Sequence, residues 1–337
     1  MISRQSDLAG YFCVERYNLL SLSELIFSVL YGFSLGVAAC AIWGLIYLVP
    51  LMLPQYDPVL IACGRFFVYG LVCVVIAPFQ WTTLKKLTRQ DWFSALRLVI
   101  FGHLVYYWCL STCVSFSGPP LAGMMMAWIP VLVAIIANAR AKRQGQGLAW
   151  KRLLPPLSVL LLGMIVANWT EFQYYVYEQS TPAETFALGI VAGVAGLLLW
   201  TWYPIRNADW LLAHRDVSPQ AWITAQGLMV LPVSTISYFV AANALLPAEV
   251  GLLGETPVRM IWVMLMAGVA CSWLAGALWN AMSQKLPPAL GGQLIVFETI
   301  FSVIYAHVWR AEWPTWSMTI GMVMLLVGVV ASLRAFR

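Results

Sequence analysis

Long apolar runs fill most of the chain, and short stretches that hold most of the charges separate them. A transmembrane helix needs about 20 predominantly apolar residues, because each residue adds about 1.5 Å along the helix axis. The runs therefore predict an all-helical membrane protein. Ten spans are expected, at residues 28–53, 58–79, 94–113, 119–138, 153–169, 183–203, 219–245, 259–282, 289–308 and 315–334.

The order of these runs repeats along the chain. Span one contains Gly36-Val37-Ala38 followed by Trp43, and span six contains Gly193-Val194-Ala195 followed by Trp200. Other matches come in the same order: Asp57-Pro58 with Ser218-Pro219, Arg65 with Gln226, Pro119-Pro120 with Pro287-Pro288, and Gly163 with Gly328.

Each repeated unit holds an odd number of spans, so the second unit enters the membrane in the opposite sense to the first. We therefore predict two inverted five-helix repeats, at residues 28–170 and 183–334, behind a cytoplasmic segment at residues 1–27. Inverted repeats place a site near the bilayer midplane that opens alternately to either side. This architecture is typical of a transporter.

Composition agrees with a membrane protein, since 61% of the residues are hydrophobic, 10% are charged and the mean hydropathy is +0.80. The net charge of +5 lies in particular loops, so we expect no nucleic-acid partner. Fifteen of the 19 Lys and Arg residues fall in the N-terminal segment, the even-numbered loops and the C-terminus. Only Arg259 and Arg310 fall in the odd-numbered loops. The positive-inside rule then predicts two cytoplasmic termini and a multi-pass protein of the bacterial inner membrane. The first 24 residues do not have the pattern of a cleavable signal.

Several chemical classes are excluded by missing motifs. The seven cysteines form no CxxC pair and no histidine cluster accompanies them, so we expect no metal and no cofactor. No P-loop motif occurs, which excludes ATP as the direct energy source. No HExxH motif and no pair of mid-span aspartates occurs, which argues against an intramembrane enzyme. A purely structural scaffold would have no evident use for an inverted repeat.

Short motifs in both halves resemble one family. They are Ala41-Ile42-Trp43-Gly44, Gly64-Arg65-Phe66, Trp128-Ile129-Pro130-Val131, and Arg310-Ala311-Glu312 with Gly321 and Gly328 after it. In these motifs, over about residues 30 to 335, the chain resembles the drug/metabolite transporter superfamily in its EamA-type branch of ten-span exporters. The resemblance implies export of small metabolites through a cavity lined mainly by spans three, four, eight and nine.

Glu298 is the leading candidate for coupling. Aligning the double prolines places it opposite Pro130, so a carboxylate stands where the family often has a proline. An ionisable side chain at mid-span costs about 2.5–3.5 kcal/mol on insertion scales and usually faces the bundle interior. Glu298 suits proton coupling or a counter-charge for an amino group, and a structural carboxylate fits equally well. Arg65 fits interhelical bonding or substrate attraction, while Pro130 would let span four bend during gating.

Aromatic and imidazole side chains inside the spans are the candidates for substrate binding, and helix packing is the alternative for each of them. They are Trp43, His103, Tyr106, Tyr107, Trp128 and Trp279, together with Glu298. Such side chains with one acid and one base suit an amino acid, above all an aromatic one, and the chain is similar to the aromatic amino-acid exporters of the same superfamily. Efflux of cationic drugs or quaternary amines is the alternative. The expected partners are a small-molecule substrate and the lipid bilayer; monomer and homodimer both fit.

Overall fold

The computed structural model describes residues 22–117, 125–126, 128–143, 145, 147–178, 182–311 and 313–335, and every regular element among them is a helix. The predicted segment at residues 1–27 lies largely outside the described residues, as do Pro119-Pro120. The first half contains α2 (Leu22–Gly44), η1 (Leu45–Leu48), α3 (Val49–Met52), α4 (Pro58–Ile76), η2 (Ala77–Gln80), α5 (Trp81–Leu84), α6 (Arg89–Val99), η3 (Ile100–Val105), α7 (Tyr106–Ser117), α9 (Ile129–Arg143) and α10 (Trp150–Glu178). The second half contains α11 (Ala183–Ala213), α12 (Pro219–Leu245), η4 (Ala248–Val250), α13 (Pro257–Leu265), η5 (Met266–Leu274), α14 (Ala275–Ser283), α15 (Pro288–Leu294), α16 (Val296–Arg310) and α17 (Trp316–Ala335).

Seven helices in the described part of the chain are long and apolar enough to cross a membrane, and two shorter apolar helices follow at Leu290–Ser302 and Trp316–Ser332. Several boundaries differ from the sequence prediction. α10 begins at Trp150, so the Pro155-Pro156 pair lies inside its first two turns. α11 continues ten residues beyond the predicted end at 203, to Ala213. This extension is stabilised by tertiary packing, because Trp210 stacks on Trp222 of α12 with parallel rings.

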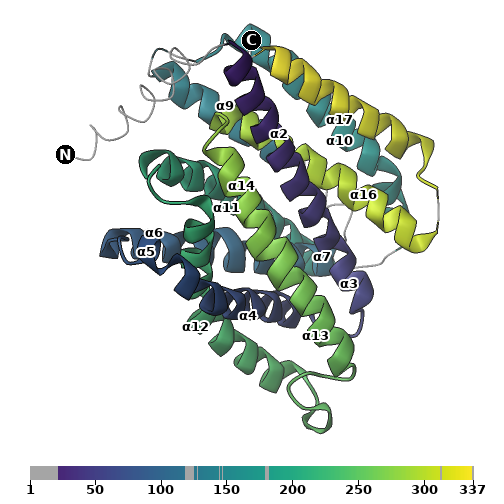
Figure 1. The fold of residues 1–337 in the computed structure, drawn as a ribbon. Coiled ribbons are helices and arrows are strands. Elements are labelled where there is room, and N and C mark those ends of the chain that lie inside the picture. The colour runs from purple at the N-terminus through teal and green to yellow at the C-terminus, as the bar shows by residue number, and fades with distance from the viewer. Residues whose placement is uncertain are drawn as a thin grey trace.

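Helices from the two halves pair along the whole molecule (Figure 1). α10 packs along α17, α4 along α12, and α9 against α15. The contact of α2 with α14 is matched by the contact of α7 with α11, and that of α4 with η5 by that of α6 with α12. Glycines permit the closest of these approaches: a Cβ atom on Gly321 of α17 would lie 2.5 Å from the backbone nitrogen of Ala167 in α10.

The helices expected as spans three, four, eight and nine are irregular. η3 and η5 are π-helical segments in spans three and eight. Span nine turns at Ile295, between α15 and α16, and the chain also turns at Trp128 just before α9. The segment predicted as the span at residues 289–308 is therefore divided into two helices, α15 and α16. π-helical segments and interrupted helices free backbone groups from regular bonding, and in membrane proteins both are tolerated where protein or a cavity surrounds them.

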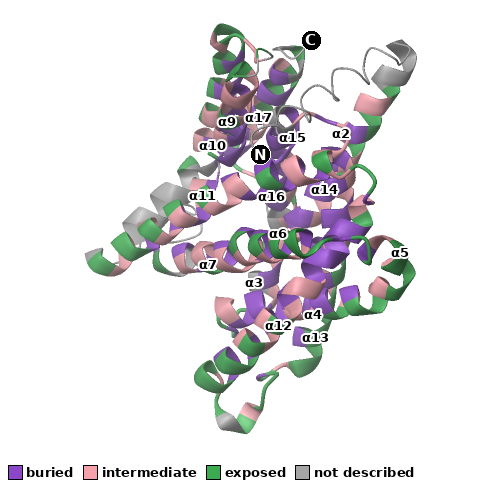
Figure 2. Cartoon of the chain, turned by 90° about the vertical axis from the view of Figure 1, so that its left-hand side faces the viewer, coloured by how far each residue is buried: buried purple, intermediate pink, exposed green. Residues whose placement is uncertain are grey.

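Buried side chains gather along the middle of the bundle, where the helices of both halves meet (Figure 2). The outer faces of α4, α11 and α13 carry exposed apolar side chains, including Val75, Val191 and Trp262. Such an outer surface is costly in water and suited to lipid. The six described cysteines are free thiols, and five of them are buried.

Candidate functional site

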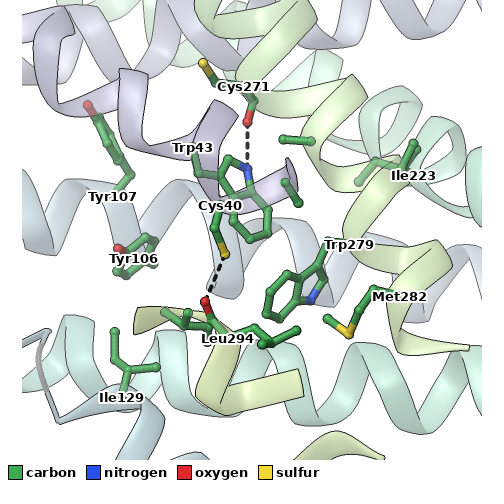
Figure 3. Close-up of a cluster of buried hydrophobic side chains, with 14 of the residues drawn as sticks. Cys40, Trp43, Tyr106, Tyr107, Ile129, Ile223, Cys271, Trp279, Met282 and Leu294 are labelled. Carbon is green, nitrogen blue, oxygen red and sulfur yellow. Dashed lines mark hydrogen bonds between the residues drawn. The ribbon is translucent and has the colours of Figure 1, made fainter. Parts of the chain in front are cut away.

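The centre of the bundle holds a cluster of aromatic side chains (Figure 3). Trp43 of α2 and Trp279 of α14 lie side by side, with ring centroids 5.1 Å apart. Tyr106 and Tyr107, at the start of α7, belong to the same buried cluster. The structure therefore brings together four of the six aromatic and histidine candidates, drawn from spans one, three and eight.

Trp200 of α11, in the second half of the chain, belongs to the same group of aromatic side chains. It stacks on Tyr106 at 4.4 Å and on Tyr203 at 5.3 Å. Its ring centroid lies 6.1 Å from that of Trp43. Trp43 and Trp200 occupy matching positions in the predicted sequence repeat, and their rings meet at the centre of the molecule.

His103 lies in the π-helical segment η3, beside the aromatic cluster. Its ring stacks on Phe66 at 5.7 Å and approaches Tyr203 at 4.7 Å. Gly102 permits this arrangement, because a Cβ atom there would lie 2.3 Å from the Tyr203 ring. The Nδ1 atom of His103 has no hydrogen-bond partner among the described residues. An imidazole nitrogen in this state is available to a ligand.

Arg65 is buried in α4 and engaged by the opposite half. Its Nε atom donates to the Ser272 hydroxyl at 2.9 Å, and Nη2 donates to the Cys271 carbonyl at 3.2 Å. The guanidinium carbon lies 5.0 Å from the Phe66 ring centroid and 5.5 Å from that of Tyr107. These contacts replace much of the hydration that a buried guanidinium loses. Arg65 thus joins α4 to η5.

The Cys271 carbonyl accepts a second bond, because the indole nitrogen of Trp43 donates to it at 2.8 Å. Cys271 lies within η5, where the wider π-helical turn alters the regular pattern of backbone bonds. One carbonyl of the second half is therefore held by two side chains of the first half.

Glu298 lies in the first turn of α16, three residues after the turn at Ile295, and only 9% of it is exposed. The Tyr47 hydroxyl donates to its Oε1 atom at 3.3 Å. Its Oε2 atom has no partner among the residues that the structure describes.

Comparison with known proteins identifies the family. The EamA-like transporter family matches residues 30–146. The inner membrane protein YtfF of Escherichia coli (strain K12) is 35% identical over 314 residues, which cover 92% of this chain and 96% of YtfF. The chain belongs to the EamA-like transporter family. A solved crystal structure shares the fold at a TM-score of 0.68 and 15% identity, over 90% of this chain and 97% of that one.

Membership of this family confirms the resemblance to the drug/metabolite transporter superfamily. This EamA-type transporter is a multi-pass protein of the inner membrane. The family is one of membrane transporters and not of enzymes, and it implies a small-molecule substrate in a lipid environment.

Two of the residues that the sequence predicts for the site, Trp128 and Pro130, lie apart from the central cluster. Trp128 is 42% exposed and lies in the turn before α9. Pro130 is buried as the second residue of α9.

Sequence reasoning missed Tyr47 and Gln293. Tyr47 lies near the end of span one, where an aromatic residue is typical of the interfacial belt, so no signal distinguishes it. Gln293 is fully buried in α15, and neither of its amide atoms has a partner among the described residues. The sequence does contain a signal for Gln293, because it is a lone side-chain amide in an apolar run.

Proposed function

We propose that this protein is a secondary exporter that moves small metabolites carrying an amino group by alternating access. The observation that carries the proposal is Glu298, a buried carboxyl group with one oxygen bonded to Tyr47 and the other without a partner among the described residues. A buried polar atom without a partner is costly, so it indicates a position that a ligand or proton completes. Glu298 is accordingly the proposed residue of both substrate binding and proton coupling.

The proposed architecture consists of ten spans in two inverted repeats, at residues 28–170 and 183–334, with both termini cytoplasmic. The pairing of helices supports it, because the contacts keep their pattern when each span is exchanged with the one five places along. The start of α2 and the end of α17 lie at the same end of the bundle, as this topology requires (Figure 1). The two π-helical segments occupy the third span of each repeat.

We propose amino acids, including aromatic ones, as the main substrates. The ammonium group would pair with Glu298, while Trp43, Tyr106, Tyr107 and Trp279 would contact the side chain. His103 would donate or accept at its Nδ1 atom, which has no partner among the described side chains. Trp128 and Pro130 would act where the chain turns before α9, as part of the moving half.

Uptake into liposomes tests the proposal directly. Purified protein is reconstituted and given a panel of labelled amino acids and amines, with and without a pH gradient. We expect saturable uptake of aromatic amino acids, with a response to the gradient that Glu298→Gln abolishes, while exchange continues with a higher KM for the amino acid. A Glu298→Gln variant that keeps the full gradient response would remove Glu298 from coupling.

A second candidate is efflux of cationic drugs or quaternary amines. One observation favours it. Arg65 is already hydrogen-bonded to Ser272 and Cys271, whereas Glu298 is a buried charged residue whose Oε2 atom has no partner among the described residues. In this case Glu298 would act as the counter-charge and the Trp rings as a cage. A steep loss of cation transport in Glu298→Gln, with neutral substrates unaffected, would select it over amino-acid export.

A further inference from the structure

Tyr47 contacts Glu298 from the opposite half of the molecule. It lies in η1, a 3₁₀ segment that separates α2 from α3 near the end of span one. Its hydroxyl donates to Glu298 Oε1 at 3.3 Å. This bond is the one that the carboxyl group makes among the described side chains, so the orientation of the carboxylate depends on it.

Close packing between η1 and α16 fixes the position of the bond. Gly44 precedes η1 and lies directly against α16: a Cβ atom on it would be 2.8 Å from Phe301 Cβ and 3.0 Å from the Ser302 backbone nitrogen. Ser302 lies four residues after Glu298, on the same face of α16. The backbones therefore meet at Gly44, one helical turn from the Tyr47–Glu298 bond.

The phenol hydroxyl suits a carboxyl group that changes its charge. It donates to an ionised carboxylate, and it accepts from a protonated carboxylic acid. The contact can therefore persist in both states, whereas phenylalanine at this position would leave Oε1 without a partner in either. An unpaired carboxylate oxygen in a buried site is expensive, so the side chain would turn toward another donor.

We infer that Tyr47 is a positioning residue, which holds Oε1 of Glu298 so that Oε2 is presented to the substrate amino group. The inference rests on the proposed role of Glu298 in binding. It assigns a function to a residue near the end of span one that contacts the acid.

A double-mutant cycle in liposomes tests the inference. Transport is measured for Tyr47→Phe, Glu298→Gln and the double variant, with an amino-acid substrate and with its deaminated analogue. We expect Tyr47→Phe to raise KM for the amino acid about tenfold or more, as loss of a bond to a charged group does, and to leave the analogue unchanged. In the Glu298→Gln background the same substitution should have no further effect.

Controls keep the outcomes distinct. Tyr305→Phe removes a hydroxyl from α16 itself, where the ring stacks on Phe301, and should transport like the unmodified protein. Tyr47→His retains a hydrogen-bond donor and should keep part of the affinity that Tyr47→Phe loses. If Tyr47→Phe folds poorly, Tyr47→His takes its place in the test. A fully active Glu298→Gln would defeat the proposed role of the acid. A different outcome is that Glu298→Gln impairs transport while Tyr47→Phe has no effect, or has an effect that adds to that of Glu298→Gln. Either result would overturn the inference about Tyr47 and leave the proposed role of Glu298 standing.

Discussion

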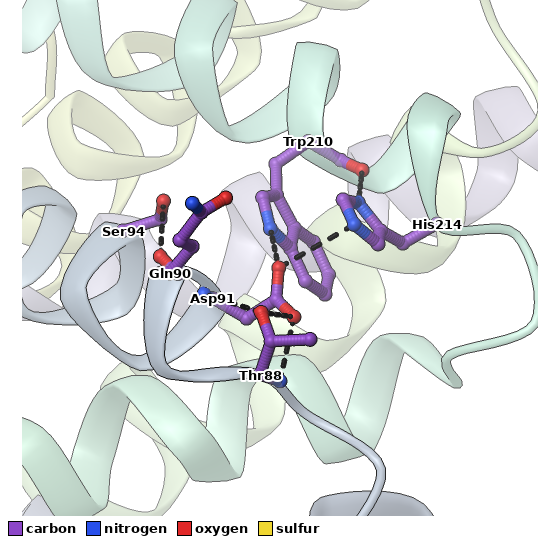
Figure 4. A network of polar contacts seen from close by, with 6 residues as sticks. All are labelled: Thr88, Gln90, Asp91, Ser94, Trp210 and His214. Carbon is purple, nitrogen blue, oxygen red and sulfur yellow. Dashed lines mark hydrogen bonds and ion pairs between the residues drawn. The ribbon is translucent and has the colours of Figure 1, made fainter.

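Asp91 offers the clearest stability prediction, because one carboxylate contacts four groups of three residues at the ends of α6 and α11 (Figure 4). Its Oδ2 atom accepts from the backbone nitrogen of Thr88 at 2.8 Å and from the Thr88 hydroxyl at 2.7 Å, completing a capping box at the start of α6. Its Oδ1 atom accepts from the Trp210 indole at 3.1 Å, and His214 Nε2 lies 3.4 Å away. Asp91 therefore anchors the extension of α11 to α6.

The cost of Asp91→Ala follows from these contacts. Loss of the helix cap costs about 1 kcal/mol. The Trp210 donor, left unpaired in a partly buried position, costs about 1–2 kcal/mol more. The half-exposed His214 pair adds at most about 1 kcal/mol. Together these give a loss of about 2–4 kcal/mol. Asp91→Asn keeps an acceptor for Trp210 and loses the bond from the Thr88 backbone, so it should cost about 1 kcal/mol.

Thermal unfolding in detergent, followed by tryptophan fluorescence, measures both variants. At about 2 °C per kcal/mol for a chain of this length, Asp91→Ala should lower Tm by about 4–8 °C and Asp91→Asn by about 2 °C. Equal Tm values for the two variants would show that the Trp210 bond contributes nothing, and the reasoning would fail.

Three further predictions use other contacts. Gly321→Val should force α17 away from α10, because a Cβ atom there lies 2.5 Å from the Ala167 backbone nitrogen; we expect a loss of about 1–3 kcal/mol in thermal unfolding, with transport per folded molecule unchanged. Arg65→Lys keeps the charge but loses the forked guanidinium group that reaches both Ser272 and the Cys271 carbonyl. Buried Cys271 should therefore become reactive to a membrane-permeant maleimide. Equal labelling of Cys271 in both proteins would refute this. Asn207→Leu leaves the Trp222 and Gln226 donors unpaired, and it should destabilise the fold by about 2–4 kcal/mol in the same unfolding assay.

The sequence predicts much of the fold because the bilayer imposes strong constraints. An apolar run of sufficient length must form a helix there, since no water is available to satisfy its backbone. Glu298 could be singled out for the same reason, because a carboxyl group is rare at that depth. The burial of Trp43 and Trp279 could not be derived this way, since a Trp inside a span faces lipid as readily as protein.

The irregular backbone escaped prediction because its causes are tertiary. Ile295 is a residue with no tendency to end a helix, yet α15 stops beside it. The thiol of Cys40 donates to the Leu294 carbonyl at 3.2 Å, so a neighbouring helix satisfies a group near the turn. Neither η3 nor η5 contains proline. Contacts from other helices, and not local residue preference, account for these features.

Matching positions in the two halves carry different chemistry, and this difference bears on the transport cycle. Arg65 bonds across the halves, from α4 to η5. Its counterpart Gln226 donates to Asn207 at 3.0 Å, and Asn207 donates to Asn280 at 2.7 Å, all within the second half. Breaking the contact at Arg65 exposes a charge, whereas the amide network can move as one body with its helices intact. If the two halves form the proposed inverted repeats, these unequal bonds would make the two ends open at different free-energy costs, and the proposed alternating-access cycle would have a preferred resting state.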